Sequence, residues 1–468
     1  MRIINLILMT ALTLPVFSFE LNVEKCKKLA LENSEEIQIA EKQKDIADSR
    51  KIQYRSNFFP KISFDLSYMY KFDELKYSLD EAYLPTYVYQ DGGLVPNILI
   101  NPADQQPVIG PDGNPVFNEY AYFPGMDLSL SLKHSYFASV KAEQPLFFGG
   151  KIINAYKMAK IGSEAAKINY DREKENLLIE TELAYWRLVS LRQKIILAEK
   201  YEMLVKQTVK QLIDAEETGM IQQNCLLKAK VKLNEAKLKK QKALHGNKLA
   251  TLDLARILGT ELPENINLAD SIINIPANVD IDISETMFVN RKDYKLLQAK
   301  YNIAEKEKAV AFAEYLPEIG ISASYSEVCY ELNDNEEKSR DTTIMANFSL
   351  PLFKWGETYA KNRQAKLKKE QSKLELDKNT ELMKLEIKKN EFALKDAELR
   401  HATSVEYVRQ ATENLRVAND NFNLKRVTLT NLLEAQTEWE KAKSEKIDAA
   451  TDYQKAYLNL LRSVGKLY

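Results

Sequence analysis

The chain carries the same order of sequence motifs twice, and this duplication constrains its fold more than any other feature. Residues 57–68 are echoed by residues 314–325, and residues 144–150 are echoed by residues 350–356. In both copies 81 positions separate a proline from a later leucine pair. These positions are Pro145 and Leu226 in the first copy, and Pro351 and Leu432 in the second. Because helices that lie side by side in one wall must end at the same depth, equal spacing predicts two equivalent long helices rather than two unrelated domains.

Each copy contains a long stretch without proline, rich in Ala, Leu, Lys and Glu. Apolar residues recur in it three and four positions apart, as in a coiled coil. A pause near Gly219 predicts two helices in the first copy, at 151–217 and 222–258, and the second copy predicts helices at 356–423 and 428–463. At 1.5 Å per residue, the first helix of each copy would be roughly 100 Å long.

A pair of short strands precedes the long helices in each copy. We expect strands at about 61–70 and 135–146, and at about 318–330 and 342–351, with the acidic segment 331–341 as the loop of the second pair. Ile62, Phe64 and Leu66 alternate with polar residues. This alternation fits a membrane barrel, and it fits equally well a soluble sheet with one buried face.

The order of these elements predicts a domain organisation for the whole chain. We expect a first repeat at 19–262, a connector at 263–282 and a second repeat at 283–468. The segment 71–134 carries seven of the fourteen prolines, which predicts a long extracellular loop without regular elements. Its tyrosines suggest that it packs on itself or on a neighbour.

The first residues predict the compartment. Arg2 is followed by an apolar run to Phe17, and this pattern predicts a cleaved signal peptide at 1–18. The run is shorter than the roughly 20 residues that a membrane-spanning helix needs.

Composition argues against several classes of function. The 66 basic and 67 acidic residues form no basic block, so nucleic-acid binding is not expected. The three cysteines and three histidines are spread widely, which predicts neither a disulfide framework nor a metal site. No motif for a nucleophile, a cofactor or a phosphate stands out, so we expect neither an enzyme nor a bound cofactor.

Four strands cannot close a membrane barrel, and an open sheet edge cannot face lipid. The chain would therefore share a barrel with copies of itself. Two copies would give eight strands with a lumen filled by side chains, and three would give twelve strands with room for a conduit. The strand count by itself leaves both possibilities open.

The motifs, taken in order and in duplicate, resemble those of TolC-family outer-membrane efflux proteins. The resemblance rests on Gln-Pro-Leu-Phe-x-Gly-Gly at 144–150, Leu-Leu-Glu-Ala at 432–435 and Gly-Met-Ile at 219–221. It implies a mainly α-helical protein with a membrane β-barrel: a homotrimer whose twelve-stranded barrel in the outer membrane continues into a twelve-helix periplasmic α-barrel. It also implies a passive exit duct that works with a periplasmic adaptor (membrane fusion) protein and an inner-membrane pump of RND, ABC or MFS type.

The same resemblance assigns roles to individual residues. The adaptor would contact the periplasmic tip turns, and two positions after the second turn would form the constriction. Strand-to-helix junctions would lie at the Pro and Gly motifs that occur in both copies. The tip residues are Gly219, Met220, Ile221, Lys425, Arg426 and Val427; the constriction residues are Asn431 and Glu434; the junction residues are Pro145, Gly149, Gly150, Pro351 and Gly356.

The second tip departs from the family pattern. Lys425 stands where glycine is expected, so we expect a stiffer turn or one that adopts a left-handed conformation less readily. Val427 and Phe422 stand at the positions of the arginine and tyrosine that link the coils in the closed state. Those polar links are not reproduced, and the sequence does not identify what holds the tip closed.

Two plainer interpretations stay open at this point. Glu434 is either part of a ring of carboxylates that attracts cations or an ordinary solvated residue of a helix. A periplasmic coiled-coil structural or adaptor protein without a pore would explain the heptads, although it would not explain two strand pairs between matched helices. The cargo is not encoded in any motif.

Overall fold

The computed structural model of the chain contains two compact units. The helical unit consists of the described residues within Met1–Arg55, Gly150–Glu314 and Phe353–Tyr468, and the strand unit of those within Ser56–Gly149 and Tyr315–Leu352. The structure describes residues 20–72, 75–130, 132–219, 221–263, 266–273, 275, 286–332 and 335–466. The signal peptide expected at 1–18 and residues 276–282 of the expected connector lie outside the described residues.

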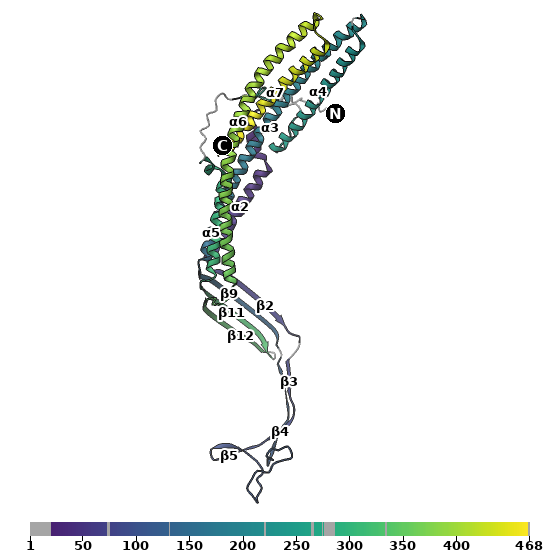
Figure 1. Ribbon diagram of the computed structural model, residues 1–468. Coiled ribbons are helices and arrows are strands. Elements are labelled where there is room, and N and C mark those ends of the chain that lie inside the picture. The colour runs from purple at the N-terminus through teal and green to yellow at the C-terminus, as the bar shows by residue number, and fades with distance from the viewer. Residues whose placement is uncertain are drawn as a thin grey trace, which may run out of the picture. The chain divides into compact units, whose positions relative to one another are not determined.

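Two long helical hairpins dominate the helical unit (Figure 1). The helices are α1 (Val23–Asn33), α2 (Glu35–Ser56), α3 (Lys151–Glu217), α4 (Gln223–Leu258), the short 3-10 helix η1 (Met287–Asn290), α5 (Lys292–Ala313), α6 (Glu357–Asn423) and α7 (Leu429–Ser463). Both α3 and α6 contain 67 residues, while α4 and α7 contain 36 and 35. The hairpins α3–α4 and α6–α7 therefore match in length, and the ends of these helices fall within one residue of the expected ranges.

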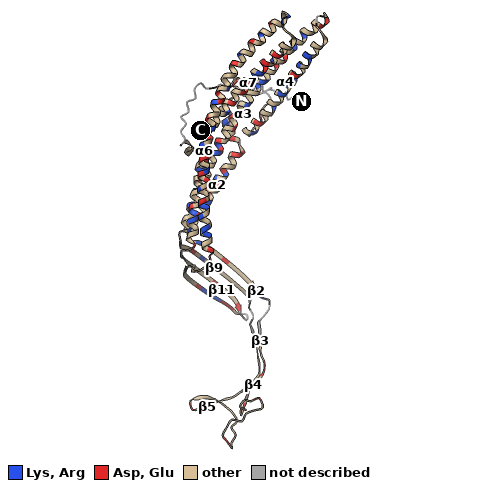
Figure 2. Cartoon of the chain, viewed as in Figure 1, with Lys and Arg blue, Asp and Glu red and all other residues tan. Residues whose placement is uncertain are grey.

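The long helices pack side by side through apolar stripes. Helix α3 contacts both α4 and α7, and α7 contacts α6, so the order across the layer is α4, α3, α7, α6. Leu188 and Val205 of α3 are fully buried, as is Leu432 of α7. Lys, Arg, Asp and Glu are mixed along the remaining surface of the helices (Figure 2). Apolar burial along one stripe, with solvated charges elsewhere, explains why these sequences form long paired helices.

The N-terminus and the described part of the connector pack against α3. Strand β1 (Glu20–Leu21) pairs in parallel with β10 (Asn267–Leu268). The buried Tyr185 hydroxyl donates to Asp270 Oδ2 at 2.7 Å, and burial together with this hydrogen bond raises the pKa of Tyr185. Cys26 lies in the same core, and burial raises the pKa of its thiol to about 12. Cys26 is therefore a packing residue whose thiol stays protonated and unreactive.

Helices α2 and α5 occupy equivalent places in the two sequence copies but have different surroundings. Helix α5 packs between α3 and α6. Helix α2 is tied to α3 through Asp48, which accepts a hydrogen bond of 2.5 Å from Ser163. The equivalent residues of the second copy are Glu305 and Lys369, an ion pair at 3.0 Å between α5 and α6. Helix α2 leaves three of its isoleucines exposed. They are Ile39, Ile46 and Ile52.

The strand unit contains an antiparallel four-stranded sheet in the order β12, β11, β9, β2. Its strands are β2 (Lys61–Tyr70), β9 (Leu132–Phe148), β11 (Glu318–Leu332) and β12 (Asn335–Ser349). Strands β2 and β12 form the two edges. The sheet thus joins strands of both copies through the pairing of β9 with β11.

The two faces of this sheet differ in chemistry. Phe64 lies opposite Val140, which lies opposite Tyr325, and residues directly opposite each other in a ladder share a face. On the other face, Ser63, Lys141, Ser324 and Thr343 follow one another across the strands. Ile62, Phe64 and Leu66 are 74%, 66% and 63% exposed. The described chain therefore leaves a broad apolar sheet face uncovered.

The second strand pair is longer than expected. Strand β12 begins at Asn335, so the segment 331–341 is mostly paired strand and its prediction as a loop was wrong. Pairing continues because the charges match across the strands: Arg340 Nε donates to Glu327 Oε2 at 3.0 Å. At its other end β12 stops at Ser349, ahead of Pro351, which has no N–H to donate.

The segment 71–134 also differs from expectation, because it contains regular elements. It folds as a ladder of short strands: β3 (Leu75–Leu79) pairs with β8 (Met126–Leu130), β4 (Ala82–Pro85) with β7 (Tyr120–Phe123), and β5 (Tyr87–Gln90) with β6 (Gly93–Pro96). Pro85 and Pro96 are tolerated because they are the last residues of β4 and β6, where no ladder N–H is required. The rings of Tyr83 and Tyr122 pack 5.3 Å apart, so the segment packs on itself.

The turn between α3 and α4 and the turn between α6 and α7 have the same backbone conformation. Gly219 follows α3 with φ 70°, and Lys425 follows α6 with φ 56°. Lys425 thus adopts the left-handed conformation that we expected it to adopt less readily than glycine. Two backbone hydrogen bonds hold it there: the Lys425 N–H donates to Phe422 O at 2.9 Å, and the Arg426 N–H donates to Asn421 O at 2.8 Å.

We expect this conformation to carry measurable strain, since a left-handed residue with a Cβ costs about 1–2 kcal/mol. Lys425→Gly should unfold at a higher midpoint than Lys425→Ala, by the equivalent of about 1 kcal/mol, in denaturant unfolding followed by far-UV circular dichroism. The same two substitutions at Lys395, in the interior of α6, should give the opposite order. An alanine variant at 425 as stable as the glycine variant would contradict the strain.

Candidate functional site

The first hairpin tip is a short glycine turn on an apolar base. Gly219 is exposed, and its N–H donates to Glu216 O at 2.8 Å. Ile221 is partly buried against the cluster formed by Val209, Leu212 and Leu226. Met220 lies outside the described residues. The first tip therefore presents backbone and small side chains on a fixed apolar support.

The second tip ends in exposed cations. Lys425 and Arg426 are both exposed, and Val427 is half-buried. Within the described residues, the Arg426 side chain forms no ion pair. Phe422, at the position that the resemblance gives to a tyrosine, packs into the same apolar cluster as Ile221. Apolar packing thus replaces the polar link at this position.

Asn431 belongs to the start of α7. Its N–H donates to the Thr428 hydroxyl at 3.3 Å, and its side chain contacts that hydroxyl as well. Thr428 is the N-cap of the helix, so Asn431 completes a reciprocal cap. A stabilising role for Asn431 in the turn follows directly from these contacts.

Glu434 lies one turn further along α7 and faces a groove between α4 and α7. The groove has a volume of about 650 Å³ and is also lined by Lys228, Lys232 and Glu438. The Glu438 carboxylate accepts a hydrogen bond of 2.8 Å from the Tyr407 hydroxyl. In the part of the chain that the structure describes, the exposed Glu434 carboxylate has no hydrogen-bond or ion-pair partner. It is therefore available to ions or to another copy of the chain.

Polar contacts that the sequence did not reveal join α7 to the first hairpin. Gln436 is buried, and its Nε2 donates to the Thr208 hydroxyl at 2.9 Å. One residue on, Thr437 and the Tyr201 hydroxyl lie 3.3 Å apart. Gln436 Oε1 is buried and has no hydrogen-bond partner among the described residues, which costs about 1–3 kcal/mol. This contact is therefore specific but only half satisfied.

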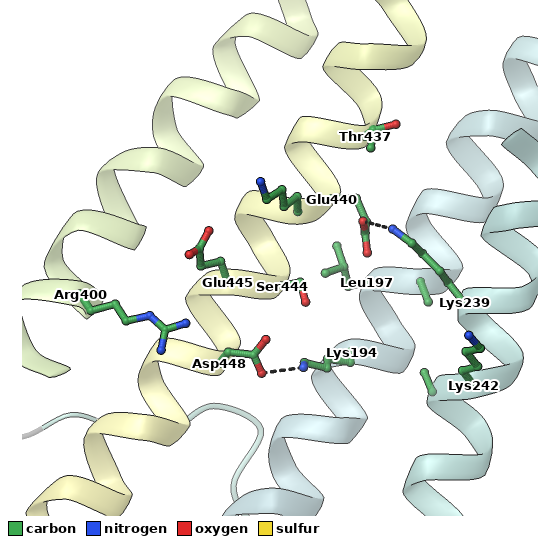
Figure 3. Close-up of a pocket in the computed structure, with 13 residues that line it drawn as sticks. Lys194, Leu197, Lys239, Lys242, Arg400, Thr437, Glu440, Ser444, Glu445 and Asp448 are labelled. Atoms are coloured by element: carbon green, nitrogen blue, oxygen red, sulfur yellow. Dashed lines mark hydrogen bonds and ion pairs between the residues drawn. The ribbon is translucent and has the colours of Figure 1, made fainter.

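Two ion pairs extend this row along α7, across a cavity of about 660 Å³ (Figure 3). Lys239 Nζ on α4 lies 2.5 Å from Glu440 Oε2, and Lys194 Nζ on α3 lies 2.6 Å from Asp448 Oδ1. We call the four α7 residues of these contacts the α7 contact row. They are Gln436, Thr437, Glu440 and Asp448. All four hold α7 against α3 or α4.

One sequence signal could have revealed part of this row. Thr208 lies beside Val205 and Val209 in the apolar stripe of α3, and Gln436 follows Leu432 and Leu433 in that of α7. Polar residues inside an apolar stripe often pair with each other across helices. The ion pairs carry no such signal, because lysine and glutamate occur throughout these helices.

The junction motifs adopt paired left-handed conformations. Gly149 and Gly150 have φ 58° and 80°, and Trp355 and Gly356 have φ 47° and 84°. Gly150 and Gly356 are the N-caps of α3 and α6. Pro145 lies in β9 opposite Gly320, next to a register shift. Pro351 follows β12. Both copies therefore change from strand to helix through the same backbone geometry.

The described residues lack two further features. No group of three or more His, Cys, Asp and Glu side chains there could hold a metal ion. Among the described helices, none combines the length and the apolar character that crossing a membrane requires.

Comparison with known proteins gives one family and a consistent fold. The family model for outer membrane efflux proteins matches residues 285–466. The outer membrane efflux protein BepC of Brucella suis biovar 1 (strain 1330) is 23% identical over 242 residues, which cover 51% of this chain and 52% of that protein. This match spans about half the length of each protein.

Solved structures match over nearly the whole chain. The Campylobacter jejuni CmeC outer membrane channel has a TM-score of 0.76 and 18% identity, covering 95% of this chain and 86% of that chain. The open state of the Neisseria gonorrhoeae MtrE outer membrane channel has a TM-score of 0.69 and 15% identity, covering 95% of this chain and 88% of that chain. At these identities the matches establish a shared fold. The family likeness is thus established for residues 285–466, and the fold of these channels for nearly the whole chain.

Proposed function

We propose that the chain is the outer-membrane exit duct of a tripartite efflux or type I secretion system, a passive channel rather than an enzyme. Its partners would be two further copies of itself, a periplasmic adaptor protein, an inner-membrane pump of RND, ABC or MFS type, and outer-membrane lipid. The exposed apolar face of the four-stranded sheet carries this proposal.

That face needs an apolar environment. A soluble protein rarely exposes a contiguous apolar patch of more than a few hundred Å². Phe64, Leu66 and Ile344 are each more than 60% exposed on this face. Lipid would cover it, while Ser63, Ser324 and Thr343 on the opposite face would line a wet lumen. A periplasmic coiled-coil protein without a pore has no use for such a sheet.

The two sheet edges argue for further copies. Unpaired backbone groups cost several kcal/mol each in lipid, so β2 and β12 must be paired. The β12 edge of one copy can pair with the β2 edge of the next. Three copies would close twelve strands around a conduit, whereas two would close eight strands around a lumen filled by side chains.

Helix α2 supports the same arrangement. Its counterpart α5 lies between α3 and α6 of one chain, and Leu296 and Ile303 of α5 are partly covered there. The matching α2 residues, Ile39 and Ile46, are 58% and 53% exposed. Helix α6 of a neighbouring copy would cover them as α6 covers α5. A ring of twelve long helices would result.

In this arrangement Glu434 would line the periplasmic constriction, with Asn431 capping α7 beside it. Three Glu434 carboxylates on one axis would attract cations. The exposed tip residues would be the adaptor's contact: Gly219, Met220, Ile221, Lys425, Arg426 and Val427. The junction residues Pro145, Gly149, Gly150, Pro351 and Gly356 would join barrel strands to tunnel helices. Opening would require α7 to move away from α3 and α4, and the α7 contact row would resist that movement.

We expect the Glu434 carboxylate to set ion selectivity. Purified wild-type channel in planar bilayers should conduct, prefer cations and be blocked by divalent cations on the periplasmic side. Glu434→Gln removes the charge and keeps the shape, so it should lose both properties, while Glu434→Asp should keep them. Unchanged selectivity in Glu434→Gln would refute the ring, and a wild-type protein that never conducts would refute the duct.

The α7 contact row should set how easily the channel opens. Lys194→Met with Lys239→Met removes both ion pairs to α7 and keeps the apolar stems, so the open probability in bilayers should rise several-fold. Each partly exposed pair is worth up to about 1 kcal/mol. Lys232→Met is the matched control, because Lys232 pairs with Glu235 of its own helix. Equal effects of the two changes, or none, would show that the row does not hold α7.

A further inference from the structure

A second groove lies on the side of α7 that faces away from Glu434. Residues 439, 443, 446 and 450 of α7 point into it, roughly half a helical turn around from residues 434, 441, 445 and 448. Helix α3, helix α6 and the described residues around Ile273 complete its walls, and its volume is about 610 Å³. This volume lies within the range of small-molecule sites, which is roughly 300–1,000 Å³.

The described polar residues that line this groove are all cationic or neutral. Lys200 of α3 and Lys443 and Lys446 of α7 line it, together with His401 and Gln193, and no carboxylate is among the described lining residues. Within the described chain, none of the three lysines forms an ion pair. We call this site the lysine groove.

On the opposite face of α7, positively charged side chains are paired with carboxylates, so the excess of positive charge is confined to the lysine groove. There Lys194, Lys239 and Arg400 are all paired with carboxylates of α7. Where cations of neighbouring helices meet α7 on that face, α7 supplies the acid. In the lysine groove α7 supplies two more lysines instead.

Burial and the clustered positive charges lower the pKa values of two of the lining residues. Burial, together with the nearby Lys446 and Lys200, lowers the pKa of Lys443. Burial and the nearby Lys446 also lower the pKa of His401. Both groups would be relieved by an anion placed among them.

The rest of the lining is apolar. Ile196 and Ile272 are 53% and 71% exposed, and Ile447 lies beside them. The Lys443 ammonium lies 6.0 Å from the centre of the Trp439 ring, so the aromatic wall adjoins the cationic end. An occupant therefore meets both lysine ammonium groups and apolar side chains in the same groove.

We propose that the lysine groove binds a small amphiphilic carboxylate, whose anionic head lies among Lys200, Lys443 and Lys446 and whose hydrocarbon body lies against Ile196, Ile272 and Trp439. This site is separate from the proposed conduit. It faces the opposite side of α7 from Glu434, so occupancy does not depend on transport. A long polyanion is a poorer fit, because the cationic part is confined to three side chains within a bounded groove.

Trp439 makes the site directly measurable. The full chain in phosphatidylcholine nanodiscs is titrated with octanoate, and tryptophan emission is recorded. We expect a saturable change that Trp439→Phe abolishes, although Trp186 and Trp355 remain. Octan-1-ol, with the tail alone, and acetate, with the charge alone, should each bind at least about tenfold more weakly.

Lysine variants test the charge requirement. Lys443→Met with Lys446→Met keeps the apolar stems and should weaken octanoate binding about tenfold or more, and Lys200→Met should do so independently from α3. Lys441→Met on the opposite face of α7 is the control and should bind as wild type. Octan-1-ol binding as tightly as octanoate, or Lys443 and Lys446 variants that bind like wild type, would overturn the proposal. The selectivity measured at Glu434 is unaffected by either outcome.

Discussion

The edges of the four-stranded sheet impose the constraint on which the other features depend. One face of the sheet is apolar and exposed, and the two outer strands, β2 and β12, keep unpaired backbone groups. In lipid such groups must be paired, since each one costs several kcal/mol when it is not. One chain cannot pair them, because β2 and β12 are separated by two strands. If the sheet lies in lipid as proposed, further copies would be needed for reasons of backbone chemistry alone.

The helical unit is held together by side-chain packing rather than by strand pairing. Its helices bury apolar stripes against one another, and their surfaces carry mixed charges. Between the first hairpin and α7, however, the buried contact of Thr208 with Gln436 is polar and half satisfied. A contact of this kind specifies one arrangement without making it very stable. In the channel proposed above, that balance would suit a wall that opens and closes. The contact would then supply a closing interaction where Val427 and Phe422 stand in place of the polar pair that the resemblance predicts.

Much of the fold could be predicted from repetition and periodicity. The long helices lack proline and keep their apolar stripes, and a pause near Gly219 separates the first two. Their residue ranges could therefore be predicted from the sequence. The strands in the segments 71–134 and 331–341 could not be predicted. Their composition indicated solvent-exposed loops, whereas strand pairing depends on the residues that lie opposite. Arg340, in the segment whose polarity indicated a loop, pairs instead with Glu327 of the predicted strand.

The hairpin tips also contain features that could not be predicted from the sequence. Lys425 was expected to disfavour a left-handed turn, yet two backbone hydrogen bonds place it there. The α7 contact row was missed because its ion pairs join helices far apart in sequence, and any lysine in these helices has several acidic candidates. Glu434 and Asn431 were singled out by the family resemblance, and only the cap at Asn431 can be understood from contacts within one chain.

The central claim is that three copies close the sheet edge to edge, and one crosslink tests it most directly. Within a chain, Lys141 of β9 lies opposite Ser324 of β11. Repeating this pairing between copies sets Asn347 of β12 opposite Ser67 of the neighbouring β2. In a background without native cysteines, Ser67→Cys with Asn347→Cys should oxidise to a covalent species of three chains on non-reducing gels. Moving the second cysteine to Phe348, on the other face, should prevent it. Failure to crosslink at 347, or a covalent species of two chains only, would contradict the trimeric barrel.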